Sequence, residues 1–179
     1  MEQMVKRIKR ELKYQGAIVD IYTDYMQMPD GKVAEWDYVA HRKGAAAVLA
    51  VQEDGKLLMV RQYRNALERF SLEIPAGARD SRQEPTIVCA ARELEEETGY
   101  RCEHLEFLIS LRTTVAFCNE EIDIFLARDL IPSKQHLDPD EYLEIEAHSL
   151  EELCDWIYEG KLQDSKTVAA VLAYKNRYC

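Results

Sequence analysis

Residues 77–100, GARDSRQEPTIVCAARELEEETGY, decide how the rest of the chain is interpreted. They open with a loop that carries no large apolar side chain, and Pro85 then suits the first turn of a helix, where its missing N–H is not needed. Apolar and small residues recur at helical spacing as far as Gly99, which is a typical stop signal. The sequence therefore predicts a helix from near Pro85 to Gly99.

This helix carries a cluster of carboxylates. Glu93 and Glu97 are four residues apart and share one face, with Glu96 beside them. Like charges so placed disfavour a helix by roughly 0.2–0.5 kcal/mol per pair, whereas a divalent cation reverses the sign, because hard cations bind several carboxylate oxygens. A run of glutamates is most often a solvated surface. The glycine-bearing loop in front of the helix favours a binding site instead, since it brings backbone groups and carboxylates together.

The same stretch resembles the Nudix box, in which Gly, five residues, Glu and seven residues precede Arg-Glu-aliphatic-x-Glu-Glu-x-Gly-aliphatic. Residues 92–100 match the second half, with Tyr100 in the last aliphatic position. Glu84 stands seven residues before Arg92, as the pattern requires, but six residues rather than five separate it from Gly77. Loops tolerate insertions best, so this departure concerns the loop and the role of Glu84, not the helix.

The flanks of the box are similar to the ADP-ribose pyrophosphatase branch of Nudix hydrolases. The similarity covers residues 60–77, VRQYRNALERFSLEIPAG, and residues 36–39, WDYV. It implies an α+β fold: a Nudix α/β/α sandwich with a mixed sheet, preceded by an N-terminal β-hairpin subdomain. It also implies a homodimer, in which that hairpin reaches across to complete the partner's nucleoside pocket.

The resemblance implies a metal site on the acidic helix. Glu93 and Glu97 are the first-choice ligands, with Glu96 third and the carbonyl of Ala76 at the loop entrance. Mg²⁺ is the expected ion, with Mn²⁺ as a substitute, because Mg²⁺ accepts a few carboxylates together with waters and substrate phosphates. Arg92 is expected to point away from the metal face and to orient a box glutamate.

Further residues are expected to act on the substrate. Glu141 is the expected general base, with Asp138 and Asp140 as weaker candidates. Arg61 and Arg64 are expected to hold phosphate or the terminal ribose, although two arginines near an acidic helix can also be simple ion-pair partners. Two more residues are Glu73, expected to bond ribose or shape the pocket, and Trp36, expected to stack on adenine. Without the resemblance, a lone Trp is usually core or interface filler.

Composition excludes several classes of protein. The chain has 179 residues and a formal net charge of -10, which argues against nucleic-acid binding. An anionic substrate is repelled at long range unless metal ions and local arginines reverse the field. The five cysteines form no C-x-x-C pair, as in a reduced cytoplasmic protein. No apolar run approaches membrane-spanning length, and the first residues lack the apolar core of a secretory signal, so no membrane partner is expected.

The remaining segments predict the organisation of the chain. Residues 1–41 are expected to form an N-terminal unit, with a short helix or loosely ordered arm over 2–13 and a hairpin over 15–41, and residues 42–179 a Nudix domain. Strands are expected over 45–51, 56–60, 105–111, 122–127 and from 142. Helices are expected after the caps Ser149 and Asp164. In the link at residues 113–120, Val115 and Ala116 replace the Pro-Gly of relatives, a change expected to affect specificity.

The resulting prediction is metal-dependent hydrolysis of ADP-ribose to AMP and ribose 5-phosphate. Two alternatives remain open. One is another Nudix substrate, such as a nucleoside diphosphate sugar or a dinucleotide, because the longer loop and the altered link both bear on substrate choice. The other is a non-catalytic nucleotide sensor, whose hallmark would be a lost box glutamate; Glu93, Glu96 and Glu97 are all present.

Overall fold

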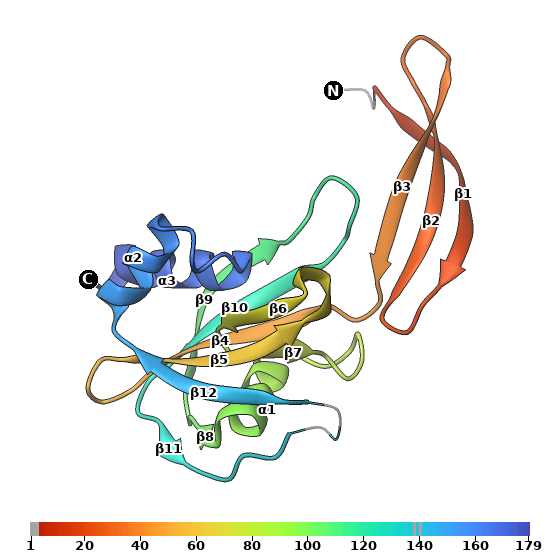
Figure 1. The fold of residues 1–179 in the computed structure, drawn as a ribbon. Helices are drawn as coiled ribbons and strands as arrows, with labels where there is room; N and C mark the ends of the chain where they lie inside the picture. Colours follow the sequence, from red (N-terminus) through yellow and green to blue (C-terminus); the bar gives the residue numbers. More distant parts are fainter. Residues whose placement is uncertain (1–3, 138, 140) are drawn as a thin grey trace.

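The computed structural model describes residues 4–137, 139 and 141–179. A three-stranded sheet projects from a larger body, in which helices cover both faces of a second sheet (Figure 1). The elements in chain order are β1 (Lys6–Gln15), β2 (Val19–Gln27), β3 (Val33–His41), β4 (Ala45–Val51), β5 (Leu57–Arg64), a 3₁₀ turn (Asn65–Leu67), β6 (Arg69–Glu73), β7 (Ala76–Ala78), α1 (Thr86–Thr98), β8 (Tyr100–Arg101), β9 (Leu105–Arg112), β10 (Glu121–Ala127), β11 (Ile131–Pro132), β12 (Leu143–His148), α2 (Leu150–Tyr158) and α3 (Ser165–Tyr178).

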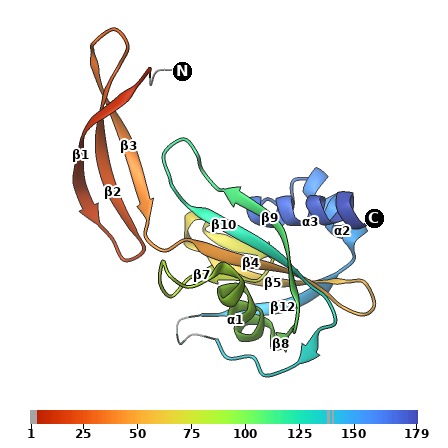
Figure 2. The same ribbon diagram turned by 180° about the vertical axis from the view of Figure 1, so that it is seen from behind.

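The sheet of the body is mixed. Its strands follow the order β12-β5-β4-β10-β9, with β6 paired to β5 and β7 paired to β4. β10 runs parallel to β4, and the other pairings in this sheet are antiparallel. Seen from behind, α1 lies on one face and α2 and α3 lie on the other (Figure 2). This arrangement confirms the expected α+β sandwich with a mixed sheet.

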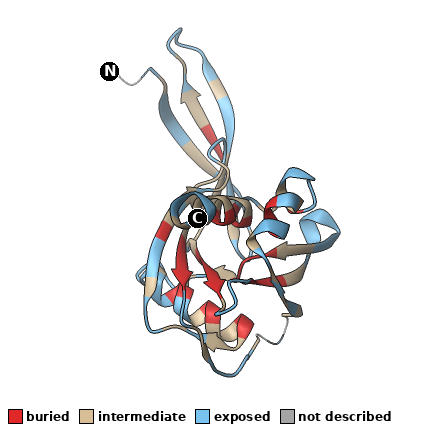
Figure 3. Cartoon of the chain, turned by 90° about the vertical axis from the view of Figure 1, so that its left-hand side faces the viewer, coloured by how far each residue is buried: buried red, intermediate tan, exposed pale blue. Residues whose placement is uncertain are grey.

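The hydrophobic core has two layers because strand side chains alternate between the two faces of a sheet. On the α1 side, Val48 and Leu58 pack with Leu94 in one buried cluster. On the α2/α3 side, Leu49 and Met59 belong to the other buried cluster. Figure 3 shows the buried residues concentrated in the central strands and on the inner faces of the helices. β4 therefore contributes to both layers, which explains why its sequence is apolar throughout.

Helix α1 begins and ends as the sequence predicts. Pro85 is its N-cap residue, and Gly99 closes it with a φ of 69° while donating its N–H to the carbonyl of Glu95. That left-handed conformation favours glycine. The helix presents Cys89, Ala90 and Leu94 to the sheet, all fully buried. The glutamates are thereby fixed along the side of a helix that cannot rotate without exposing its apolar stripe.

The N-terminal segment differs from the expectation of a short helix or loose arm. Residues 6–15 form β1, which pairs antiparallel with β2, so the expected hairpin becomes a three-stranded sheet. Apolar Ile8 and Leu12 are spaced like one helical face, but long-range pairing along β2 overrides this weak local signal. In the described part of this sheet only Thr23 and Asp24 are buried, so it has no hydrophobic core of its own.

Helix α3 is attached to the central sheet through its first turn. The Asp164 side chain caps the helix by accepting from the Thr167 N–H (3.0 Å) and the Thr167 hydroxyl (2.6 Å). The Thr167 hydroxyl in turn accepts the backbone N–H of Ile74 at 2.9 Å, just beyond β6. Thr167 is fully buried, so this hydroxyl satisfies a backbone donor that water does not reach. The segment between β6 and β7 is thus fixed by the helix above it.

Replacing Thr167 tests this attachment. Thr167→Val keeps the shape of the side chain but leaves the buried N–H of Ile74 without an acceptor, which costs about 1–3 kcal/mol. We expect the free energy of unfolding, measured by urea denaturation, to fall by that amount. Thr167→Ser retains the hydroxyl and serves as the matched control, with a smaller loss. Equal losses in the two variants would show that the hydroxyl is not what matters.

Candidate active site

The carboxylate of Glu93 lies directly against the backbone of β7. A Cβ atom built on Gly77 would fall 2.2 Å from the carboxylate carbon and Oε1 of Glu93. Only glycine therefore permits this contact, which places the side chain between α1 and the strand. Burial raises the pKa of Glu93 to about 7, opposed by the adjacent Arg92 and assisted by the charges of Glu96 and Glu141.

Glu97 is more deeply placed, with 1% of its surface exposed. Its Oε2 accepts the backbone N–H of Ala76 at 2.9 Å, which ties the helix to the start of β7. Burial raises its pKa to about 8; the Ala76 N–H lowers it, whereas the charges of Glu93 and Glu141 raise it further. Two carboxylates are therefore held where each disfavours the ionisation of the other.

Glu141 belongs to the same electrostatic cluster. Its negative charge raises the pKa of both Glu93 and Glu97, so the structure brings the expected base near the two first-choice metal ligands. It stands two residues before the start of β12 at Leu143. The weaker candidates, Asp138 and Asp140, lie outside the described residues.

Arg92 does not point away from the metal face, contrary to the expectation. Its Nη1 donates to Glu93 Oε1 at 2.7 Å and to Glu96 Oε2 at 2.9 Å. Its Nη2 donates to the carbonyl of Ala78 at 3.0 Å. The reason is spacing: residues one and four positions along the helix both lie within reach of a long, forked guanidinium. Arg92 therefore does contact box glutamates, and it acts as their internal counter-cation.

The residues present fit a hard divalent cation. Glu93 and Glu97 are buried, their ionised forms are penalised, and a cation would relieve that penalty. Gly77 leaves space for the Glu93 carboxylate beside backbone, where a carbonyl such as that of Ala76 can join the ligand set. Within the described part of the chain, no three acidic, His or Cys side chains already converge on one point. Glu96, bound to Arg92, would have to turn to become a third ligand.

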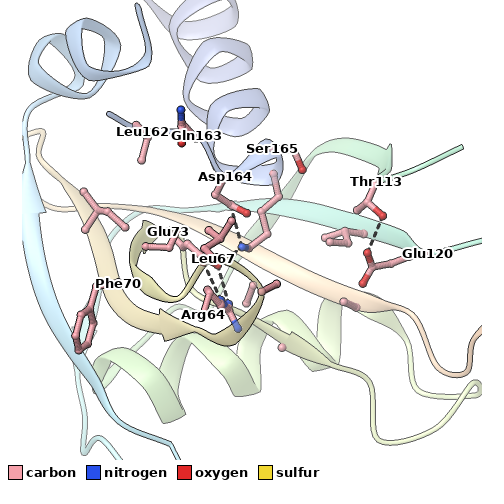
Figure 4. Close-up of a pocket in the computed structure, with 18 of the residues that line it drawn as sticks. Arg64, Leu67, Phe70, Glu73, Thr113, Glu120, Leu162, Gln163, Asp164 and Ser165 are labelled. Atoms are coloured by element: carbon pink, nitrogen blue, oxygen red, sulfur yellow. Dashed lines mark hydrogen bonds and ion pairs between the residues drawn. The ribbon is translucent and has the colours of Figure 1, made fainter. Parts of the chain in front are cut away.

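A cavity of about 780 Å³ is lined by residues of β5, β6, β7 and the first turn of α3. Glu93, Glu97 and Glu141 are not among its described lining residues, but Ala76 and Gly77, which contact Glu97 and Glu93, are. On its wall Arg64 binds Glu73 through two hydrogen bonds, Nε to Oε1 at 2.8 Å and Nη2 to Oε2 at 2.7 Å (Figure 4). The ammonium of Lys166 bonds Glu73 Oε2 and, at 2.9 Å, Asp164 Oδ2. Although burial opposes ionisation of Glu73, Arg64 and Lys166 outweigh it and lower its pKa to about 2.

Arg61 and Arg64 both line the cavity, as a phosphate-binding role requires, and both are also ion-paired. Arg61 donates its Nε to Glu146 Oε1 on the neighbouring strand β12. Each arginine can therefore be an ion-pair partner and still face the cavity in which a phosphate would bind. Trp36 lies in the middle of β3 with 47% of its surface exposed, and it is not among the described residues that line this cavity.

Sequence reasoning missed the residues supplied by α3 and by the link. Lys166 is 7% exposed, and its ammonium bonds Glu73, which is far away in the sequence. The run D-S-K-T at residues 164–167, which starts at the helix cap, is the sequence feature that could have indicated a buried lysine at the start of this helix. In the link, Glu120 accepts from the Thr113 hydroxyl at 2.6 Å and lies 3.7 Å from His41 Nε2. Both Glu120 and His41 line the cavity, so the base of β3 contributes to the site.

Fold and site together define a class of protein: a mixed-sheet α+β domain with buried helix carboxylates beside a large cleft. The sequence matches the NUDIX domain family over residues 40–171. The chain belongs to the Nudix family and is an enzyme, as the resemblance predicts. Nudix hydrolases act on small-molecule nucleotide substrates and generally use divalent metal ions.

Named relatives cover nearly the whole chain. It is 40% identical to a methanol dehydrogenase activator of Bacillus methanolicus over 93% of this chain and 90% of that protein. An ADP-ribose pyrophosphatase of Bacillus subtilis (strain 168) is 38% identical with the same coverage. A crystal structure of an ADP compounds hydrolase aligns with a TM-score of 0.84 over 97% of this chain and 94% of that one, at 22% identity, and so supports the fold. None of the described helices has the length and apolarity needed to span a membrane.

The pairing of Glu73 predicts a pH dependence of stability. A carboxyl whose folded pKa is lowered from 4.5 to about 2 contributes stability that is present above pH 4.5 and lost as the pH falls toward 2. Glu73→Gln removes this contribution at neutral pH. We expect the variant to be less stable than the wild type by on the order of 2 kcal/mol at pH 7.

The difference in the free energy of unfolding between the wild type and Glu73→Gln should then become smaller as the pH is lowered from 5 toward about 3, because protonated Glu73 resembles Gln. Urea denaturation at each pH measures it. Glu144→Gln, on the exposed part of β12, is the control. A gap that stays constant with pH would show that Glu73 is not held ionised by Arg64 and Lys166.

Proposed function

We propose that the protein hydrolyses ADP-ribose to AMP and ribose 5-phosphate with Mg²⁺, for which Mn²⁺ can substitute. The observation that supports this most directly is the electrostatic cluster of Glu93, Glu97 and Glu141 beside a cavity lined by Arg61 and Arg64. Similarity over nearly the whole chain to ADP-ribose pyrophosphatases of Bacillus subtilis and Mycobacterium tuberculosis supports the choice of substrate.

In this proposal the chain divides the chemistry among its residues. Glu93, Glu97 and the Ala76 carbonyl hold metal, with Glu96 as a further ligand that Arg92 orients. Bound metal neutralises the charge that builds on diphosphate oxygens and lowers the pKa of water. Glu141 accepts a proton from the attacking water. Arg64 and Arg61 bind phosphate or the terminal ribose through the guanidinium edges that face the cavity, and Glu73 keeps Arg64 in place.

Removing a single charge from the cluster tests these roles. In Glu97→Gln, the amide is a poorer ligand for a hard cation, so we expect kcat to fall by about 10²–10³-fold and the Mg²⁺ requirement to rise. In Glu141→Gln, loss of the base should lower kcat by about 10²–10⁴-fold while Mg²⁺ affinity changes little. Release of AMP, followed by chromatography, gives kcat, and calorimetric titration gives the affinity for Mg²⁺.

Glu95→Gln is the matched control, because Glu95 lies on the same helix but bonds Ser133 on the other side of it. Near-normal turnover in either test variant would remove that residue from its role. The same assay run on a nucleoside diphosphate sugar and a dinucleotide tests the substrate, since the altered link at residues 113–120 lines the cavity through Thr113, Thr114 and Glu120. A kcat/KM for ADP-ribose below that for either competitor would change the assigned substrate within the family.

We further propose that residues 1–41 form a separate N-terminal unit, residues 42–179 form the Nudix domain, and the protein is a cytoplasmic homodimer. A three-stranded sheet without a core needs another surface to be stable. This sheet exposes apolar side chains on all three strands and on the turn between β1 and β2: Ile8, Leu12, Tyr14, Ile18, Ile21, Val33 and Trp36. A second copy of the chain covers them in this proposal and places Trp36 against the adenine in the partner's cavity.

Deleting residues 1–41 should abolish the dimer and raise KM for ADP-ribose together. Light scattering at micromolar concentration measures the mass, and steady-state kinetics measure KM. Trp36→Ala in the full chain separates the two effects: we expect about a 10-fold or greater rise in KM from lost base stacking, with the dimer retained. A full-length protein that is monomeric at micromolar concentration would disprove this assembly.

A further inference from the structure

The additional residue in the box loop is accommodated by an arginine that the loop folds around. Arg79 Nε donates to the carbonyl of Glu84 at 2.7 Å, and its Nη2 donates to the carbonyl of Arg82. Its Nη1 reaches the carbonyl of Lys43 at 3.4 Å, and its backbone N–H donates to Gly44 at 3.2 Å. The planar guanidinium thus holds the end of the loop and the segment between β3 and β4 in one arrangement.

A second arginine repeats this connection. Arg82 Nε donates to the carbonyl of Arg42 at 2.6 Å. Residues 42–44, here called the hinge, are the only covalent path from the N-terminal sheet to the body. Two loop arginines therefore bind successive hinge carbonyls, so the box loop and the hinge cannot move apart without breaking both contacts.

The hinge is also bound to the N-terminal sheet. The Arg42 side chain binds Asp20 through two hydrogen bonds, of 3.1 and 2.5 Å. It also donates to the carbonyls of Ala17 at 2.9 Å and Gly16 at 2.5 Å, which form the turn between β1 and β2. The backbone of Arg42 thus accepts from the loop while its side chain grips the base of the N-terminal sheet.

The box loop is connected to helix α1 through Glu84 and Arg92. The Glu84 carboxylate accepts the backbone N–H of Asp80 at 2.6 Å and lies 3.7 Å from Arg92 Nε. Among the described residues, that Nε is the one buried side-chain nitrogen or oxygen without a hydrogen-bond partner. A small movement of Glu84 toward Arg92 would give this Nε a hydrogen-bond acceptor. Since Arg92 also binds Glu93 and Glu96, that movement would fix the positions of both glutamates.

We infer that Arg79 and Arg82 are positioning residues that lock the box loop to the hinge, so that the N-terminal sheet and the carboxylates of α1 keep one relative placement during the reaction. This inference rests on the proposed function, in which the sheet of each copy offers Trp36 to the adenine in the partner's cavity and α1 of each copy holds metal, so the lock fixes where each sheet meets the partner. Neither arginine touches the carboxylates of α1 directly. Their effect is transmitted through Glu84 and Arg92.

The test uses full-length protein with Arg79→Ala, Arg79→Lys, Arg82→Ala and Arg42→Ala. Arg79→Ala should lower kcat by about 10-fold or more, as expected for a small misplacement of catalytic groups, and amide hydrogen exchange should increase over residues 78–84. Arg79→Lys should behave like Arg79→Ala, because a lysine cannot reach three carbonyls at once. Arg82→Ala should increase exchange at residues 42–44. Exposed Arg101 on β8 supplies the control, Arg101→Ala.

A double-mutant cycle distinguishes transmission from independent damage. If Arg42 and Arg79 act through the same hinge, kcat/KM of the Arg42→Ala, Arg79→Ala double variant should fall by less than the product of the two single-variant fold losses. For Arg79→Ala combined with Arg101→Ala, the fold losses in kcat/KM should multiply. The inference is overturned if Arg79→Lys restores kcat, if the Arg42 and Arg79 effects multiply, or if exchange over residues 78–84 is unchanged. Hydrogen exchange needs no substrate, so it still decides the inference if wild-type protein fails to hydrolyse ADP-ribose.

Discussion

The burial of two carboxylates between α1 and β7 is the constraint on which the site depends. Glu93 occupies space that any side chain at position 77 would fill, and Glu97 is anchored by the N–H of Ala76. Ionising both in this position is unfavourable, and their pKa values rise to about 7 and 8. A fold gains nothing in stability from such a pair. The proposed function explains its presence, because a bound divalent cation would offset the charge of both carboxylates.

The segment from β6 to β7 makes this arrangement possible because it is held from both faces of the sheet. From the α3 side, Lys166 binds Glu73 and the Thr167 hydroxyl binds the N–H of Ile74. From the α1 side, Glu97 binds the N–H of Ala76. A loop fixed this way can place a carbonyl with the accuracy that metal binding requires. Helices from both layers thus bond to one short segment, residues 73–76.

The sequence predicted what local pattern determines and missed what tertiary contact determines. Helix α1, strand β4 and the cap at Asp164 carry their own periodicity or capping signals, and all three are observed. Strand β1 was mistaken for a helix or arm because its pairing with β2 is not visible in local propensity. Lys166 was missed because its partner Glu73 is 93 residues away in the chain. Helical spacing brings Glu93 and Glu96 within reach of Arg92, but the contact that turns its side chain toward β7, the carbonyl of Ala78, is made outside the helix and is not visible in the local pattern.

The charges around the cavity explain why a divalent metal belongs to the chemistry of this chain. The protein carries a net charge of -10, so its overall field repels a diphosphate. Arg64 and Lys166 are already neutralised by Glu73 and Asp164, and Arg61 by Glu146. These pairs keep the cations well placed but leave little unbalanced positive charge for phosphate. In the proposed function the arginines therefore orient the substrate, and the positive charge that balances the diphosphate enters with the metal assigned to α1.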